Sequence, residues 1–301
     1  MDKIILQAPA KINLLLDVVG RRENGYHEVR MVMQTIGIYD TIEIRKGGEG
    51  IHLAITNPMS KMGEGCVQDY VSADEKNLAY KAAALFNKRL LIKTGKNPEC
   101  GVDILVTKRI PIAAGLAGGS TDAATVLNGM NMLFGEPFTA TELEEMSPEI
   151  GADVAFLIRG GTRLCEGIGE VLTDLPTVPP MKLLLAKPDF DVSTKEVYTE
   201  LDARPIEHHP DCDAMIEAIR RQDGRLVAEC MGNVLADVTM RRYPEIGNIV
   251  EAMKKGGALN AMMSGSGPSV FGIFEEDAQA EAVLMELMDM GYTQLFLTAT
   301  V

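Results

Sequence analysis

The stretch "IPIAAGLAGGSTDAATVLNGMN", residues 110–131, joins a run of glycines to a helical apolar pattern. Its loop carries three glycines and two hydroxyl residues, Gly115, Gly118, Gly119, Ser120 and Thr121. Apolar residues then recur at helical spacing, at Ala123, Ala124, Leu127, Met130 and Phe134. The preceding "GVDILVTKRIP" is typical of a strand. Strand, glycine loop and helix together can hold an anion on backbone N–H groups at the helix N-terminus.

Two familiar nucleotide loops do not fit this stretch. A Walker A loop needs Gly-Lys followed by Ser or Thr, and the Gly95-Lys96 pair is followed by Asn97. The glycine spacing also fails the dinucleotide-binding pattern. A flexible turn before an ordinary helix cap remains an alternative to phosphate binding.

Composition limits the partners that this chain can bind. Its 301 residues suit two domains that share a cleft. A net charge of -14 argues against a nucleic-acid or anionic-membrane surface, because such partners attract basic faces. A small phosphorylated ligand needs only a local basic pocket. The basic residues that flank the proposed cleft in sequence are Lys11, Arg21, Arg22, Lys108 and Arg109.

The cysteines and the N-terminus predict a cytoplasmic protein. The five cysteines are odd in number and form no CxxC pair, which indicates reduced thiols. No apolar run is long enough for a membrane span, and the first residues lack a signal-peptide core. We therefore expect no membrane association.

Strands and helices mix without regular alternation, which favours an α+β fold over a doubly wound sheet. "APAKINLLLDVVG" (8–20) suits a strand with Lys11 and Asn13 on one face. Residues 55–74 lack a period and suggest a long loop. In the second half, we expect helices over 214–220 and 224–235. The strands expected there are "MKLLLAKP", "SVFGIF" and "TQLFLTA".

Three blocks in this order resemble the GHMP kinases, the superfamily of galactokinase, homoserine kinase and mevalonate kinase. They are "APAKINLLLDVVGRRENGYHEV" (8–29), "IPIAAGLAGGSTDAA" (110–124) and "MSGSGPSVFGIF" (263–274). The resemblance implies a two-domain α+β fold. Its N-terminal domain, residues 1–168, would be ribosomal-protein-like α/β, and its C-terminal domain, residues 169–301, ferredoxin-like α/β. The active site would lie in the cleft between them.

Shorter pieces match one branch of this family, whose substrate is cytidine-diphospho-methylerythritol in the non-mevalonate route to isoprenoids. These pieces are "KIN", "GYHEV", "GADVAFLIRGG", "GIGE" and "VSTKEVY". The resemblance implies an ATP-dependent kinase that phosphorylates the 2-hydroxyl of this substrate by direct in-line transfer.

The resemblance assigns catalytic roles to two residues. Asp153 matches the general base that takes the proton of the attacking hydroxyl, and Lys11 matches the catalytic lysine. A neighbouring cation would keep such a carboxylate ionised. Taken alone, Asp153 would be a helix N-cap and Lys11 an ordinary strand lysine.

The cofactors implied are ATP and Mg²⁺. The matching ATP-binding positions are Lys108, Pro111, Ile112, Ala113, Ala114, Gly115, Leu116, Ala117, Gly118, Gly119, Ser120 and Thr121. Ser120 is also the expected Mg²⁺ ligand, because a hydroxyl at this position can reach the metal that accompanies ATP.

The expected substrate-binding residues are Asn13, Tyr26, His27, Thr194 and Tyr198. In the family, the first tyrosine and a second aromatic residue stack on the two faces of cytosine, and the histidine hydrogen-bonds its edge. Stacking supplies energy and the polar edge supplies identity. Without the resemblance, Tyr26 and His27 would be ordinary loop packing.

Some features depart from the family pattern. Ala117 stands where the family has glycine, so we expect ordinary negative-φ backbone there. Thr121 replaces a serine, and Ala155 replaces a proline after the proposed base. "HHPDCD" (208–213) invites a metal reading, but its ligands are too crowded for a tetrahedral site, which favours a solvated loop.

Three other functions remain as alternatives. The chain could be a GHMP kinase for another small alcohol, a nucleotide-binding protein without catalysis, or an RNA-binding module; the net charge argues against the last. We expect a monomer or homodimer acting on a small molecule.

Overall fold

The computed structural model describes residues 1–23, 25–57 and 72–301. Its chain divides into two compact units. Unit 1 comprises residues 1–10, 38–112 and 117–160, and unit 2 comprises residues 11–37, 113–116 and 161–301. Neither unit is one continuous segment, because strands β1 (Lys3–Arg21) and β2 (His27–Lys46) each contribute one half to either unit. The division into residues 1–168 and 169–301 therefore stays a prediction about sequence domains.

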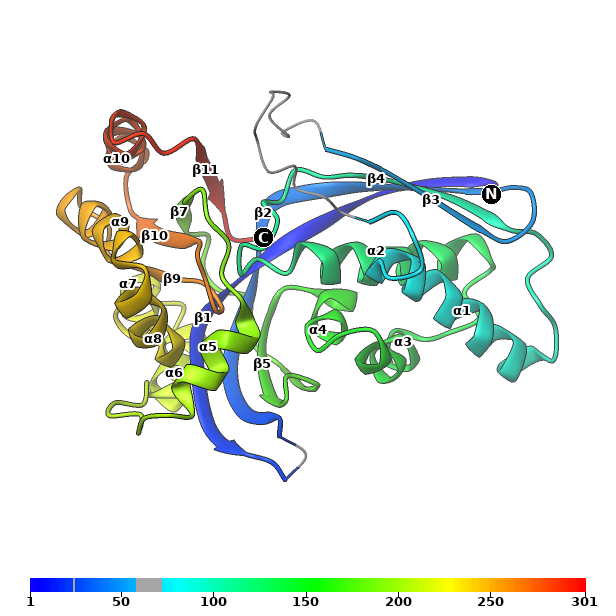
Figure 1. Cartoon of the computed structure of the whole chain (residues 1–301), viewed down its shortest axis with the longest axis horizontal. Helices are drawn as coiled ribbons and strands as arrows, with labels where there is room; N and C mark the ends of the chain where they lie inside the picture. Colours follow the sequence, from blue (N-terminus) through cyan, green and yellow to red (C-terminus); the bar gives the residue numbers. More distant parts are fainter. Residues whose placement is uncertain (24, 58–71) are drawn as a thin grey trace. The chain divides into compact units, whose positions relative to one another are not determined.

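Unit 1 is a sheet covered on one face by helices. Strands β3 (Ile51–Thr56) and β4 (Val102–Thr107) join the unit 1 halves of β2 and β1, in the order β3-β4-β2-β1. Its helices are α1 (Leu78–Thr94), α2 (Gly118–Leu133), α3 (Ala140–Met146), the 3₁₀ turn η1 (Ser147–Glu149) and α4 (Val154–Arg159). Figure 1 shows α1 and α2 side by side along the sheet.

The predicted helix after the glycine loop is confirmed as α2. Ala123, Ala124, Leu127 and Met130 are fully buried. Helices α1 and α4 both pack against α2, which therefore lies inside unit 1. Its first residue is Gly118, so the helix N-terminus follows directly on the glycine loop.

Unit 2 contains two groups of strands. In one, the second half of β1 pairs with β8 (Gly232–Asn233), the first half of β2 pairs with β5 (Thr162–Gly167), and β6 (Val171–Asp174) extends β5. The other is an antiparallel sheet in the order β11-β7-β10-β9, formed by β7 (Lys182–Lys187), β9 (Asn260–Met263), β10 (Val270–Phe274) and β11 (Gln294–Ala299).

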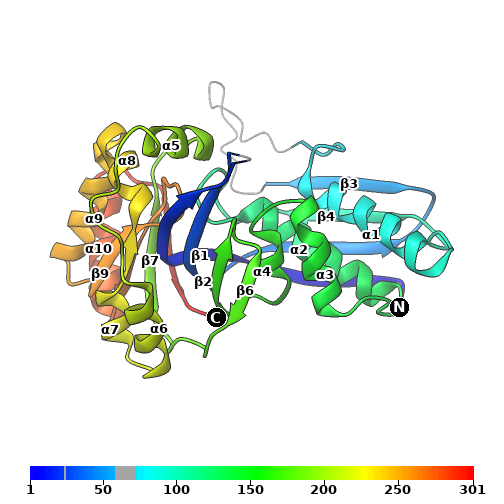
Figure 2. The same cartoon turned by 90° about the horizontal axis from the view of Figure 1, so that it is seen from below.

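The helices of unit 2 are α5 (Thr194–Leu201), α6 (Cys212–Arg220), α7 (Gly224–Glu229), α8 (Val234–Arg242), α9 (Pro244–Lys255) and α10 (Asp277–Asp289). Helices α9 and α10 cover one face of the antiparallel sheet, as both views show (Figures 1 and 2).

The single helix expected over 224–235 was wrong. Two helices, α7 and α8, occupy this region, with β8 between them. Gly232 and Asn233 pair with Leu15 and Leu16 of β1, and this long-range pairing interrupts the helical pattern. Most of the loop expected over 55–74 lies outside the described residues, and its first two residues end β3. In the described part of the chain, every helix is too short or too polar to cross a membrane.

Candidate active site

The backbone of the glycine loop alternates in a way that suits an anion. Ala113, Gly115 and Ala117 have φ values of 51°, 75° and 57°, and the intervening residues have no positive φ. Such alternation of right- and left-handed residues turns successive N–H groups toward one concave side, which binds anions. The expectation of ordinary backbone at Ala117 was wrong. The loop adopts the left-handed conformation there despite the Cβ, at a cost of about 1–2 kcal/mol.

The N-terminus of α2 leaves its first N–H groups available. Its cap residue, Ala117, has no side-chain oxygen to cap them, and the first turn contains no acidic residue. Because the helix dipole places positive charge at this end, an anion is favoured here. The Thr121 hydroxyl is buried and has no hydrogen-bond partner among the described residues. Ser120, next to it, is partly exposed.

Lys108, expected to contact nucleotide, lies inside unit 1. Its side chain is 4% exposed, and its ammonium donates to Asp40 and, at 2.6 Å, to Asp122. The other oxygen of Asp40 accepts from the backbone N–H of Ile110 at 2.8 Å. A Cβ built on Gly118 would lie 3.3 Å from the Lys108 ammonium. The lysine therefore lies against the buried side of the loop, and its contact with nucleotide stays a prediction.

Two carboxylates share this one buried ammonium. Burial raises the pKa of Asp122, Lys108 opposes this rise and the neighbouring Asp40 adds to it, and together they bring the pKa to about 8. Burial alone would lower the pKa of Lys108, but Asp122 and Asp40 outweigh it and raise this pKa. The lysine therefore stays charged at neutral pH, and Asp122 holds a proton that an exposed aspartate would have lost.

Lys11 reaches the glycine loop within unit 2. It is 4% exposed, and its ammonium donates to Asn13 Oδ1 at 2.7 Å and to the Gly115 carbonyl at 3.3 Å. The predicted shared face of Lys11 and Asn13 on β1 is thereby confirmed. The Lys11 ammonium therefore lies beside the glycine-loop backbone whose conformation suits an anion.

The turn between β9 and β10 packs directly against Gly115. The Ser264 hydroxyl donates to the Gly115 carbonyl at 3.1 Å. A Cβ on Gly115 would lie 2.2 Å from the Ser264 carbonyl oxygen, so only glycine permits this approach. Gly265, with φ 57°, continues the same turn. The "SGSG" motif thus positions the loop through close backbone packing.

Asp153 occupies the N-cap position of α4 but does not cap it. Its side chain makes no capping hydrogen bond, and its φ and ψ of -78° and -10° are already helical. The alternative interpretation, in which the Asp153 side chain caps the helix, was therefore wrong. Asp153 is a half-buried residue of unit 1.

Two expected substrate residues, His27 and Tyr198, meet within unit 2. Their ring centroids are 4.7 Å apart, with the planes tilted by 33°. His27 Nε2 lies 2.6 Å from Asp202 Oδ1, and Arg21 lies 3.2 Å from the other oxygen of Asp202. Tyr26 is 59% exposed. The structure thus shows the His27–Tyr198 ring contact, whereas a base between Tyr26 and Tyr198 stays a prediction.

Thr194 opens α5, the helix that also carries Tyr198. Its hydroxyl lies 2.8 Å from the hydroxyl of Ser266, in the turn between β9 and β10. The sequence reasoning missed Ser264, Ser266 and Asp202, because nothing local distinguishes them. Asp122 was within reach of that reasoning, since a carboxylate inside an apolar helical stripe requires a partner.

Comparison with known proteins agrees with this arrangement. Residues 77–161 match the family description "GHMP kinases N terminal domain", and residues 215–292 match "GHMP kinases C terminal". The chain belongs to the GHMP kinase family.

Relatives of this GHMP kinase extend over nearly its whole length. The 4-diphosphocytidyl-2-C-methyl-D-erythritol kinase of Clostridium beijerinckii is 45% identical over 296 residues, which cover 98% of this chain and 99% of the relative. That of Clostridium perfringens is 44% identical over 297 residues, with 98% of each chain covered.

Solved structures show the same fold. The crystal structure of 4-(cytidine 5′-diphospho)-2C-methyl-D-erythritol kinase matches with a TM-score of 0.78 and 31% identity, covering 99% of both chains. A homoserine kinase from Cytophaga hutchinsonii matches with a TM-score of 0.75 at 18% identity, covering 100% of this chain and 95% of that one. The latter shows the fold alone.

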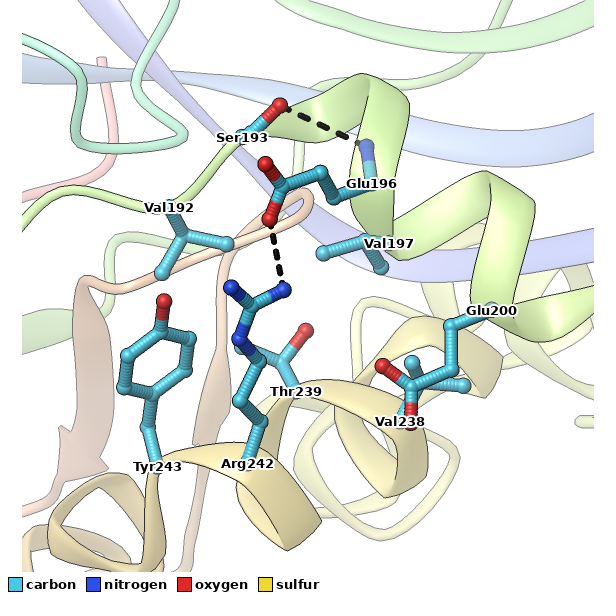
Figure 3. Close-up of a pocket in the computed structure, with 9 residues that line it drawn as sticks. All are labelled: Val192, Ser193, Glu196, Val197, Glu200, Val238, Thr239, Arg242 and Tyr243. Atoms are coloured by element: carbon cyan, nitrogen blue, oxygen red, sulfur yellow. Dashed lines mark hydrogen bonds and ion pairs between the residues drawn. The ribbon is translucent and has the colours of Figure 1, made fainter.

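The GHMP kinase also has a small pocket between α5 and α8 (Figure 3). Glu196 and Arg242 form an ion pair across it, and Tyr243 closes one side. None of the predicted site residues lines it. We assign it no ligand.

The side chains of the "HHPDCD" segment (208–213) make ion pairs in the structure of this GHMP kinase. His209 Nδ1 pairs with Asp17 at 2.7 Å, and the Asp213 carboxylate pairs with Arg30 at 2.7 Å. Over residues 1–23, 25–57 and 72–301, no group of three or more His, Cys, Asp or Glu side chains is arranged to hold a metal ion.

Proposed function

We propose that this GHMP kinase is a 4-diphosphocytidyl-2-C-methyl-D-erythritol kinase. It transfers the γ-phosphoryl group of ATP to the 2-hydroxyl of 4-(cytidine 5′-diphospho)-2-C-methyl-D-erythritol, in the non-mevalonate route to isoprenoid precursors. Relatives of that name at 45% identity over 98% of the chain support the proposal. The structural observation that carries it is the Lys11 ammonium, held against the Gly115 carbonyl of the glycine loop.

The phosphates of ATP bind to backbone N–H groups of the loop and to the N-terminus of α2. Alternating positive φ at Ala113, Gly115 and Ala117 supports this placement, because it turns N–H groups to one side. Gly118 and Gly119 present no side chains that would obstruct the approach. This binding orients the γ-phosphoryl group for in-line attack, which supplies much of the catalysis in phosphoryl transfer.

Lys11 and Asp153 perform the chemistry. Asp153 accepts the proton of the attacking hydroxyl, and the Lys11 ammonium stabilises negative charge that develops on the transferred group. Asn13 holds the ammonium at 2.7 Å, so the lysine needs little reorganisation during the reaction. Since Asp153 makes no capping bond, helix α4 does not require its carboxylate.

The residues at the start of α2 fit a magnesium ion that accompanies ATP. Ser120 would be its protein ligand. The Thr121 hydroxyl, which is buried without a hydrogen-bond partner among the described residues, is a further polar group in the same turn. A bound Mg²⁺ would neutralise negative charge on the ATP phosphates.

Specificity for the substrate comes from the aromatic residues of unit 2. Tyr26 and Tyr198 stack on cytosine, His27 bonds its edge, and Thr194 and Asn13 contact the rest of the molecule. The pairing of His27 with Tyr198 at 4.7 Å supports a site for a flat ring here. We also propose a cytoplasmic enzyme, monomeric or homodimeric, that binds no nucleic acid; free thiols and the net charge of -14 support this.

Coupled ADP release tests the function. Purified protein is assayed with ATP, Mg²⁺ and a panel of alcohols that includes the cytidine-diphospho substrate, homoserine, mevalonate and galactose. We expect turnover with the cytidine substrate and its loss in Lys11→Met. Turnover with another alcohol alone would favour a different GHMP kinase activity, and no turnover with any would favour a non-catalytic nucleotide-binding protein.

A further inference from the structure

Asp202 has two partners that fix its role. It follows helix α5 as its C-cap residue, where the negative end of the helix dipole disfavours a carboxylate. Its Oδ1 lies 2.6 Å from His27 Nε2, and its Oδ2 lies 3.2 Å from Arg21. A position unfavourable to the helix is therefore used to connect the helix with the β1–β2 hairpin.

The contact with Asp202 decides which nitrogen of His27 carries the proton. A carboxylate paired with a guanidinium is ionised and can only accept hydrogen bonds. His27 Nε2 must therefore donate to it, and in the neutral imidazole this leaves Nδ1 with a lone pair. Among the described residues Nδ1 has no hydrogen-bond partner, and the ring keeps 13% of its surface exposed. Contact with the Tyr198 ring, whose plane is tilted by 33°, restrains the imidazole.

We propose that Asp202 is a specificity-determining residue, which selects cytosine over uracil by holding His27 in the Nε2–H tautomer. This inference rests on the proposed function. Cytosine presents an amino group, a donor, at the position where uracil presents a carbonyl oxygen, an acceptor. A lone pair on Nδ1 accepts a hydrogen bond from the amino group of cytosine. It cannot donate one to the carbonyl oxygen of uracil. The carboxylate thus acts through the histidine, without touching the base.

The variant Asp202→Asn gives a directional test. The Arg21 guanidinium can only donate, so the amide oxygen of Asn turns toward Arg21 and the amide NH₂ turns toward His27. His27 Nε2 then accepts, and the proton moves to Nδ1. The lone pair that recognised cytosine becomes a donor that suits uracil.

Two measurements are made on the wild type, Asp202→Asn and the control Glu196→Gln. The control removes a carboxylate from the same helix, one that pairs with Arg242 rather than His27. The first measurement is kcat/KM for the cytidine and uridine forms of the substrate. We expect the cytidine-to-uridine ratio to fall about tenfold or more in Asp202→Asn, since one hydrogen bond to the base is lost for cytidine and gained for uridine. The control should keep the wild-type ratio. For each variant, kcat with its better substrate should stay within about threefold of the wild-type kcat.

The second measurement is ¹⁵N NMR of the histidine ring nitrogens, with His27 assigned by a His27→Gln variant. We expect a protonated Nε2 in the wild type and a protonated Nδ1 in Asp202→Asn. A wild-type enzyme that phosphorylates the cytidine substrate but has a protonated Nδ1 overturns the inference, as does an unchanged ratio in Asp202→Asn. Absence of turnover with the cytidine substrate would instead refute the proposed function, and the NMR result separates the two failures.

Discussion

Replacing Asp122 by asparagine tests the buried cluster of Asp40, Lys108 and Asp122. Asparagine keeps the shape and still accepts a hydrogen bond from Lys108, but it cannot ionise. In the folded protein, burial raises the pKa of Asp122 to about 8, whereas its ordinary value, which applies to an unfolded chain, is 3.8. Between these values the folded state binds a proton that the unfolded state has released.

The sign of the pH dependence follows from this difference. Because the folded state binds more protons, the contribution of Asp122 to the free energy of unfolding is greatest at low pH and falls as pH rises toward about 8. The slope approaches about 1.4 kcal/mol per pH unit, so the contribution falls by roughly 2 to 3 kcal/mol between pH 5 and pH 7. Asp122→Asn removes this slope, and its stability relative to wild type should rise by that amount.

Urea unfolding followed by circular dichroism measures this difference at pH 5, 6, 7 and 8. Carboxyl groups distant from this cluster titrate alike in both proteins, so they cancel in the comparison. Asp289→Asn, at an exposed aspartate of α10, is the matched control and should follow wild type at every pH. Parallel stability curves for wild type and Asp122→Asn from pH 5 to pH 8 would refute the assignment of a proton to Asp122.

Three further variants test the site. Asp153→Asn should lower kcat by about 10²-fold or more with ATP affinity retained, as for removal of a general base; near wild-type turnover in a folded sample removes Asp153 from that role. Gly118→Ala should lower the affinity for ATP in a fluorescent-nucleotide titration, because its Cβ would lie 3.2 Å from Ile110 and force the loop to shift. Gly119→Ala, whose Cβ has its nearest neighbour at 3.5 Å, should bind ATP nearly as the wild type does. Equal affinities of the two variants would place the phosphates elsewhere. Tyr26→Ala or Tyr198→Ala should each weaken the cytidine substrate by roughly 1–3 kcal/mol and leave ATP unchanged, by calorimetry; loss of ATP affinity instead would assign these rings to the nucleotide.

Local sequence determined the elements whose pattern is short-ranged. Helix α2 and strands β4, β7, β10 and β11 lie where periodicity predicted them, because apolar spacing reports directly which face is buried. The shared face of Lys11 and Asn13 follows from the two-residue repeat of a strand. The motifs sufficed for the family, since the resemblance rests on several blocks in a fixed order.

Tertiary structure decided what depends on distant partners. The break between α7 and α8 requires β1, more than 200 residues earlier, to pair with Gly232. The positive φ of Ala117 contradicts its local preference, because alanine does not favour this conformation by itself. The sequence shows only that Lys108 is a lysine at the end of a strand. Packing places its ammonium between Asp40 and Asp122.

The recognition of the base divides in the same way. The sequence shows a histidine and two tyrosines, but which nitrogen of His27 accepts depends on Asp202, 175 residues away. A proton on an imidazole follows its nearest carboxylate, and no pattern along the chain reports contacts at that separation. Sequence alone therefore supplied the residues that we propose for the chemistry, and the folded chain determined their contacts and orientation.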